Sequence, residues 1–126
     1  MQQRVALVTG SSRGIGRAIA LKLAAGGCHV VVNYPGEQDG PAETVAAIES
    51  AGGRCTTIRA DVSEVSQIND MFATIRGELG RLDILVNNAG VSTFEPFFDI
   101  TEDIWDHMHS VNLRGAFFCS QQAARL

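Results

Sequence analysis

The sequence alternates between short apolar runs and longer stretches in which apolar residues recur at helical spacing. Each apolar run is rich in β-branched residues and ends near a glycine, a proline or a polar turn, which is typical of a buried strand. The four runs predict strands over residues 4–9, 29–34 and 54–60, and over 82–90 a fourth strand that ends in a turn. The stretches between and after them predict helices over residues 14–27, 41–53 and 63–80, and a long last helix from Thr101. This order, βαβαβαβα, favours a parallel sheet that is covered by helices on both faces.

Polar residues mark the expected starts of the last two helices. Ser63, which is followed by Glu64, is a candidate N-cap for the third helix. Thr101, which is followed by two acidic residues, is a candidate for the fourth. The residues expected on one side of the fourth helix are Ile104, Met108, Val111, Gly115 and Phe118.

The alternation predicts one α/β domain over residues 1–126, a Rossmann-type doubly wound parallel sheet with strand order 3-2-1-4. A fifth strand would normally flank the fourth, so we expect the sheet to be incomplete at its C-terminal side. The last residues are helix-like as far as Leu126, without a glycine cap or a proline stop. We therefore expect the chain to be the N-terminal part of a longer protein.

Composition excludes several classes of function. Among 126 residues the net charge is -4, which is unlike the basic surface of a nucleic-acid-binding protein. No apolar run approaches the roughly 20 residues of a membrane span, so we expect no membrane partner. Three cysteines, none of them in a C-x-x-C pair, fit buried residues of a cytoplasmic protein, and we expect no metal site.

A glycine-rich loop, VTGSSRGIG at residues 8–16, joins the first predicted strand to the first predicted helix. Gly10 allows a sharp turn, while Gly14 and Gly16 allow a ligand or a neighbouring strand to approach closely. The free N–H groups at a helix N-terminus suit a pyrophosphate. The alternative is a glycine-rich turn that binds nothing.

With the spacing T-G-x-x-x-G-x-G, this loop resembles that of the classical short-chain dehydrogenases/reductases. Three further motifs carry the resemblance in the family's order: ADV at 60–62, NNAG at 87–90 and VNLRG at 111–115. The resemblance covers the whole chain. The cofactor-binding residues that it implies are Gly10, Ser12, Arg13, Gly14, Ile15, Gly16, Asn33, Tyr34, Asp61, Val62, Asn88, Ala89 and Gly90.

The family's motifs also imply roles for particular side chains. Asp61 is expected to accept a hydrogen bond from the adenine amino group, although it could instead cap the next helix. Asn87 matches a structural asparagine that bonds to backbone across the sheet. Asn112 matches a supporting catalytic asparagine, which distorts its helix and holds a water near the catalytic lysine. The alternative for Asn112 is a buried asparagine bonded to backbone.

The family's catalytic Tyr-x-x-x-Lys and serine are not found in this sequence. Its one tyrosine, Tyr34, and its one lysine, Lys22, are not at that spacing. We therefore expect the 126 residues alone to have no dehydrogenase activity. A truncated, non-catalytic dinucleotide-binding protein is the main alternative, and another Rossmann-type enzyme such as a methyltransferase is a third.

The cofactor is expected to be NADP(H) rather than NAD(H). NAD-specific proteins of this fold carry an acidic residue at the end of the second strand, but here no acid occurs before Glu37. Arg13, in the glycine loop, supplies a cation that suits a 2′-phosphate. Two alternatives leave NAD(H) possible. In one, Arg13 and Arg17 are solvated surface charges that do not contact the cofactor. In the other, Glu37 reaches the ribose.

The substrate is expected to be a small molecule with a carbonyl or alcohol group. The chain looks most like 3-oxoacyl carrier-protein reductases, followed by sugar dehydrogenases of the glucose 1-dehydrogenase type. Phe94, Phe97 and Phe98 could form an apolar wall for the substrate, or simply pack in the core. The resemblance also implies a homotetramer for the full-length protein. The three histidines show no ligand or catalytic spacing, so we expect surface or core positions for them.

Overall fold

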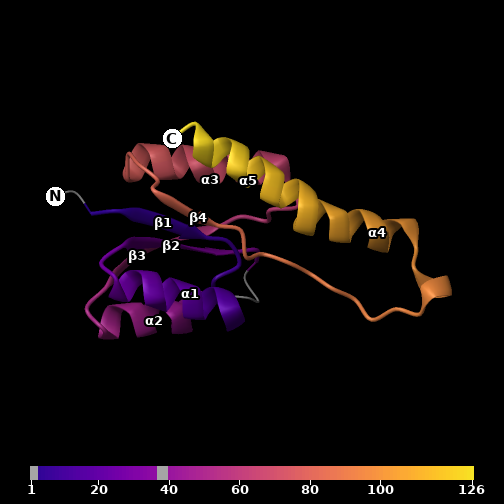
Figure 1. The fold of residues 1–126 in the computed structure, drawn as a ribbon, viewed down its shortest axis with the longest axis horizontal. Coiled ribbons are helices and arrows are strands. Elements are labelled where there is room, and N and C mark those ends of the chain that lie inside the picture. Colours follow the sequence, from indigo (N-terminus) through magenta and orange to yellow (C-terminus); the bar gives the residue numbers. More distant parts are fainter. Residues whose placement is uncertain (1–2, 37–39) are drawn as a thin grey trace.

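The computed structural model describes residues 3–36 and 40–126. Four parallel strands form one sheet in the order β3-β2-β1-β4 (Figure 1). The strands are β1 (Val5–Val8), β2 (His29–Tyr34), β3 (Arg54–Arg59) and β4 (Ile84–Val86). The helices are α1 (Gly14–Ala25), α2 (Ala42–Ser50), α3 (Val65–Glu78), α4 (Glu102–His109) and α5 (Ala116–Ala124), with a 3-10 helix η2 (Phe97–Asp99) and a π-helix η3 (Ser110–Gly115). The predicted doubly wound sheet and its strand order are confirmed.

Two apolar layers hold the sheet between its helices. Side chains of a strand alternate between the two faces, so Leu7 and Val31 lie on one face while Val8 and Val32 lie on the other. The first pair packs against α3, whose largest buried residue is Phe72. The second pair packs with residues of α1 and α2 (Figure 1). Both faces of the central strands β1 and β2 are therefore buried, which explains their nearly continuous apolar runs.

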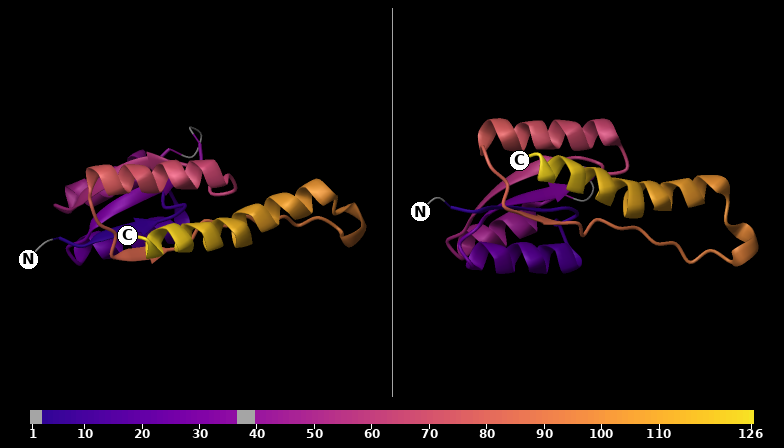
Figure 2. Two further views of the ribbon diagram at one scale, coloured as in Figure 1. Left: turned by 90° about the horizontal axis from the view of Figure 1, so that it is seen from above. Right: turned by 45° about the horizontal axis from the view of Figure 1, so that its top comes forward.

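The last helix is long, as predicted, and projects beyond the sheet. The elements α4, η3 and α5 follow one another without a break, and the chain between β4 and α4 runs out along them (Figures 1 and 2). The hydroxyl of Thr101 accepts a hydrogen bond from the backbone N–H of Ile104 at 3.2 Å, so the predicted N-cap is confirmed. No helix in the described ranges has both the length and the apolar character needed to cross a membrane.

Two sequence-based expectations about local structure are wrong. The fourth strand is only three residues long, because the chain leaves the sheet after Val86 to form the loop that carries the NNAG motif. Ser63 does not cap α3, whose N-cap position is Glu64. The reason is that the Ser63 hydroxyl donates to the Asp61 carboxylate at 2.7 Å and so turns away from the helix.

Candidate functional site

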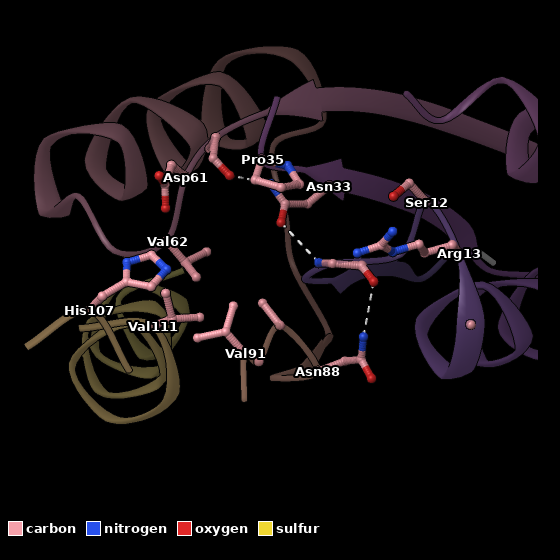
Figure 3. Close-up of a pocket in the computed structure, with 15 residues that line it drawn as sticks. Ser12, Arg13, Asn33, Pro35, Asp61, Val62, Asn88, Val91, His107 and Val111 are labelled. Atoms are coloured by element: carbon pink, nitrogen blue, oxygen red, sulfur yellow. Dashed lines mark hydrogen bonds between the residues drawn. The ribbon is translucent and has the colours of Figure 1, made fainter. Parts of the chain in front are cut away.

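A cleft of about 400 Å³ lies at the carboxyl ends of the strands, where open α/β sheets bind ligands (Figure 3). Ten of the predicted cofactor residues line it: Gly10, Ser12, Arg13, Gly14, Asn33, Asp61, Val62, Asn88, Ala89 and Gly90. Three predicted residues do not line it: Ile15, Gly16 and Tyr34. Five residues line it that sequence reasoning missed: Pro35, Ala60, Val91, His107 and Val111. The cleft therefore joins all four family motifs in one place.

The structure explains why glycine occupies three positions of the loop. Gly10 and Gly14 have φ of 62° and 58°, in the left-handed region that favours glycine. No atom lies within 4 Å of a Cβ built on Gly14, so the loop is open there. A Cβ on Gly16 would instead overlap the carbonyl oxygen of Gly10 and lie 2.5 Å from Asn88 Nδ2. Gly16 therefore allows the close packing of the Gly10 carbonyl and the Asn88 side chain inside the loop.

The N-terminus of α1 faces this open part of the loop. No side chain caps it, and its first turn contains no acidic residue. Uncapped N–H groups together with the helix dipole favour an anion at this position. The loop therefore offers the arrangement that a pyrophosphate needs.

Asn33, which we predicted to bind cofactor, lines the cleft and also supports the glycine loop from beneath. Its side chain is 1% exposed. Its Oδ1 accepts a hydrogen bond from the Gly10 backbone at 3.0 Å, and its Nδ2 donates to the carbonyls of Ile58 at 3.2 Å and Ala60 at 3.1 Å. The amide thus ties the glycine loop to the end of β3 (Figure 3). These backbone bonds engage both ends of the amide.

We expected Asn87 to bond to backbone across the sheet, but in the structure Asn88, which also lines the cleft, makes these bonds. Asn87 does not bond to backbone across the sheet, because its Nδ2 donates to Ser120 Oγ in α5 at 3.0 Å. The cross-sheet bonds belong to Asn88, whose Nδ2 donates to the carbonyls of Thr9 at 3.1 Å and Gly10 at 3.0 Å. Asn88 therefore fixes the glycine loop against the loop that follows β4.

The two arginines near the loop differ in their surroundings. Arg13 is exposed and lines the cleft. Arg17 is not the solvated charge that we considered. Its Nη2 donates to the Ser12 carbonyl at 2.6 Å, and its Nη1 forms an ion pair with Glu43 at 3.1 Å. Glu37, the possible ribose ligand, lies outside the described residues.

Asp61 lines the cleft and also organises the turn before α3. One carboxylate oxygen, Oδ1, accepts hydrogen bonds from the backbone N–H of Ser63 at 2.9 Å and from its hydroxyl at 2.7 Å. We also considered that Asp61 caps the next helix. In the structure its carboxylate instead stabilises the turn that precedes α3. These bonds also hold the carboxylate in one orientation at the rim of the cleft (Figure 3).

Asn112 lies within the π-helix η3, so the helix is distorted at the predicted place. Its Oδ1 accepts from the Val91 backbone N–H at 2.8 Å, and its Nδ2 donates to the Val91 carbonyl at 2.8 Å. The residue is exposed, unlike the buried asparagine of the alternative. It fixes the segment after the NNAG motif against the last helix.

The phenylalanines of residues 91–100 do not pack in the core. Phe94, Phe97 and Phe98 are 100%, 84% and 93% exposed. Sequence reasoning considered core packing for them, which is wrong in this structure. The apolar segment extends away from the sheet beside α4 (Figure 1).

Of the residues missed in the cleft, three have a signal in the sequence. Val91 directly follows the NNAG motif, Ala60 opens the ADV motif and Val111 opens the VNLRG motif. His107 precedes Val111 by four residues, so the two share a helix face. We had placed His107 on the surface or in the core, whereas its ring faces the cleft near Val62 and Val111 (Figure 3).

Cys119 lies behind the cleft and is 1% exposed. Burial raises the pKa of its thiol to about 11. Because only the thiolate reacts, we expect iodoacetamide at pH 8 to modify Cys119 at least about tenfold more slowly than the half-buried Cys55. Mass spectrometry of labelled peptides measures both rates. In urea the rates should converge, and equal rates in the native protein would contradict the buried position of Cys119.

Comparisons with known proteins agree with this geometry. A family model described as short chain dehydrogenase matches residues 4–126. Elsinochrome reductase 1 of Elsinoe fawcettii is 45% identical over 120 residues, which are 95% of this chain and 45% of that protein. Trihydroxynaphthalene reductase of Colletotrichum orbiculare is 42% identical over 120 residues, 95% of this chain and 43% of that protein. The chain thus spans about half the length of the curated relatives it matches.

A solved structure of a short chain dehydrogenase from Burkholderia cenocepacia in complex with NADP has the same fold, with a TM-score of 0.90 and 41% sequence identity. The match covers 98% of this chain and 50% of that one.

Proposed function

This chain belongs to the short-chain dehydrogenase/reductase family, and from that premise we propose that it forms the dinucleotide-binding part of an NADP(H)-dependent oxidoreductase. The observation that carries the proposal is the cleft, in which the open glycine loop, the uncapped N-terminus of α1 and Asp61 lie together. Its volume of about 400 Å³ falls within the range of small-molecule and cofactor sites.

The residues present fit a dinucleotide along the length of the cleft. The pyrophosphate is assigned to the N-terminus of α1 beside Gly14, where a Cβ would have open space around it. Asp61 and Val62 are assigned to the adenine end. Ala89 and Gly90 are assigned to the ribose on the nicotinamide side, next to the segment that Asn112 holds. When bound, the nicotinamide supplies a hydride donor or acceptor.

The preference for NADP(H) rests on Arg13. Its guanidinium is exposed at the rim of the cleft, beside the open part of the glycine loop. A guanidinium forms paired hydrogen bonds with a phosphate, which an unphosphorylated ribose does not offer. That a related structure contains NADP supports the same preference.

Titration of the protein with NADPH and NADH, followed by nicotinamide fluorescence, tests both the function and the preference. We expect Arg13→Ala to weaken NADPH binding about tenfold, the usual size for a charge-assisted contact at a partly exposed site, and to change NADH binding little. Raised salt should weaken NADPH binding in the unaltered protein more than in the variant.

Arg76→Ala is the matched control, because Arg76 is an exposed arginine of α3 that does not line the cleft. It should leave both affinities unchanged. Failure of the unaltered protein to bind either nucleotide would refute the function. Equal losses for NADPH and NADH in Arg13→Ala would refute only the preference.

The reaction proposed for the whole protein is hydride transfer between the nicotinamide and a ketone or secondary alcohol. Both named relatives are reductases, one of elsinochrome and one of trihydroxynaphthalene by their names. These names favour an aromatic carbonyl substrate over the acyl carrier-protein and sugar substrates that the sequence first suggested. The exposed Phe94, Phe97 and Phe98 suit such a ring system.

A non-catalytic dinucleotide-binding role is the second candidate. It is favoured by one observation, that Asn112 engages both ends of its side-chain amide with the Val91 backbone, at 2.8 Å each. Asn112 would then keep only its structural contact with Val91. NADPH binding without reduction of any carbonyl substrate would support it.

We further propose that the protein acts in the cytoplasm as a homotetramer. The exposed Trp105, Leu113 and Phe117 on the last helix support an interface there, since large exposed apolar side chains of this kind mark contact surfaces.

A further inference from the structure

The turn that carries Asp61 is held from two sides. On one side it leads into α3, and on the other it contacts the π-helix η3. A Cβ on Gly115 would lie 2.7 Å from the Val62 carbonyl oxygen, so the helix backbone and the turn approach as closely as a glycine permits. The position of η3 therefore affects where the turn lies.

Arg114 adds a directed contact at the same place. Its Nη2 donates to the carbonyl oxygen of Ser63 at 3.0 Å and to Ser110 Oγ at 2.9 Å. The bond to Ser110 fixes the guanidinium against its own helix. The group that donates to the Ser63 carbonyl is therefore held in place. A donor fixed in this way restrains Ser63 more than a freely moving surface arginine would.

Ser63 passes this restraint on to Asp61. The residue is 7% exposed, and its N–H and hydroxyl both donate to Asp61 Oδ1. All three polar groups of Ser63 are thus engaged, two with the carboxylate and one with Arg114. The chain of contacts Arg114–Ser63–Asp61 runs from the last helix to the rim of the cleft.

We propose that Arg114 is a positioning residue that sets the Asp61 carboxylate for recognition of the adenine amino group. The proposal rests on the function proposed above. Asn112 holds Val91 on the opposite wall of the cleft from the same π-helix. The π-helix therefore fixes both walls, Asn112 the nicotinamide side and Arg114 the adenine side.

The test compares two cofactors that differ only at the purine. In the hypoxanthine analogue of NADPH a carbonyl oxygen replaces the adenine amino group, so a well-placed carboxylate faces an acceptor in place of a donor. We expect the unaltered protein to bind NADPH about tenfold more tightly than the analogue, as for loss of a hydrogen bond to a charged group. Arg114→Met keeps the apolar stem of the side chain but removes its donors, and should reduce this ratio to about two or less.

Arg114→Lys should restore part of the ratio, because an ammonium group still donates to one carbonyl. Gln122→Ala is the control, since Gln122 also bonds the last helix to α3, through Asn69 Oδ1 at 3.0 Å, but lies outside the cleft. It should leave the ratio unchanged. Melting temperatures of all variants without cofactor separate positioning from loss of folded protein.

Two outcomes would overturn the proposal. If Arg114→Met weakened both cofactors by the same factor, the residue would serve stability alone. If the unaltered protein bound both cofactors equally, Asp61 would not recognise the amino group. Failure of the unaltered protein to bind either cofactor is a different result, which removes the proposed function and this inference with it.

Discussion

Gly16→Ala is expected to destabilise the protein by about 3 kcal/mol and to abolish measurable dinucleotide binding. The added Cβ would overlap the Gly10 carbonyl and lie 2.5 Å from Asn88 Nδ2. Neither group yields easily, because the first is backbone and the second is held by two carbonyls. Relief of the overlap would displace Gly10 and open the loop. Urea denaturation and nucleotide titration measure the two losses.

Gly77→Ala is a matched control, the same change at an exposed position in the last turn of α3. No atom lies within 4 Å of a Cβ built there. Alanine is the better helix former, so this variant should be at least as stable as the unaltered protein and should bind nucleotide normally. Equal stability of Gly16→Ala and the unaltered protein would mean that the loop is less tightly packed than the structure indicates.

The fold was predictable because two periodicities in the sequence follow directly from it. Strands buried on both faces require nearly continuous apolar runs, and helices on those faces require apolar residues at helical spacing. The glycine positions were predictable for a similar reason, since a left-handed φ at Gly10 and a crowded site at Gly16 both exclude other side chains. Each of these constraints limits the residue type at a single position, so it can be inferred from a single sequence.

Hydrogen-bond partners were less predictable, because they depend on directions in space that the sequence does not carry. Neighbouring residues in the loop after β4 point differently, so Asn87 reaches α5 while Asn88 reaches the glycine loop. Similarly, the Ser63 hydroxyl has two possible roles close by, a cap on α3 or a bond to Asp61. The hydroxyl donates to the Asp61 carboxylate, because a hydrogen bond to a charged acceptor is the stronger one. Most of the predicted residues line the cleft, but the partners of Asn87 and Ser63 differ from those expected.

Asn33→Asp is expected to lower the free energy of unfolding by about 3–5 kcal/mol at pH 8, the usual cost of an uncompensated buried charge. The residue occupies the end of β2, where NAD-specific proteins of this fold carry an acid. Design from sequence alone would therefore select this change to favour NADH. In the structure the Nδ2 group donates to the carbonyls of Ile58 and Ala60, and a carboxylate oxygen there would face both. We expect lost stability and no gain in NADH affinity.

The pH dependence identifies the cause of this loss. Burial beside two carbonyls raises the pKa of the introduced carboxyl in the folded state above its unfolded value. The folded variant then binds a proton more tightly than the unfolded chain, so its stability rises as the pH falls. Urea denaturation of Asn33→Asp should show a smaller deficit at pH 5 than at pH 8.

Asn69→Asp is the control for this substitution, because Asn69 is exposed on α3 and its Oδ1 already accepts a hydrogen bond from Gln122. Its stability should change little at either pH, since an exposed carboxylate stays hydrated. A stable Asn33→Asp variant that binds NADH more tightly would show that residue 33 reaches the ribose directly. In that case the glycine loop would not depend on the amide beneath it, and the end of β2 would be part of the binding surface and not of its scaffold.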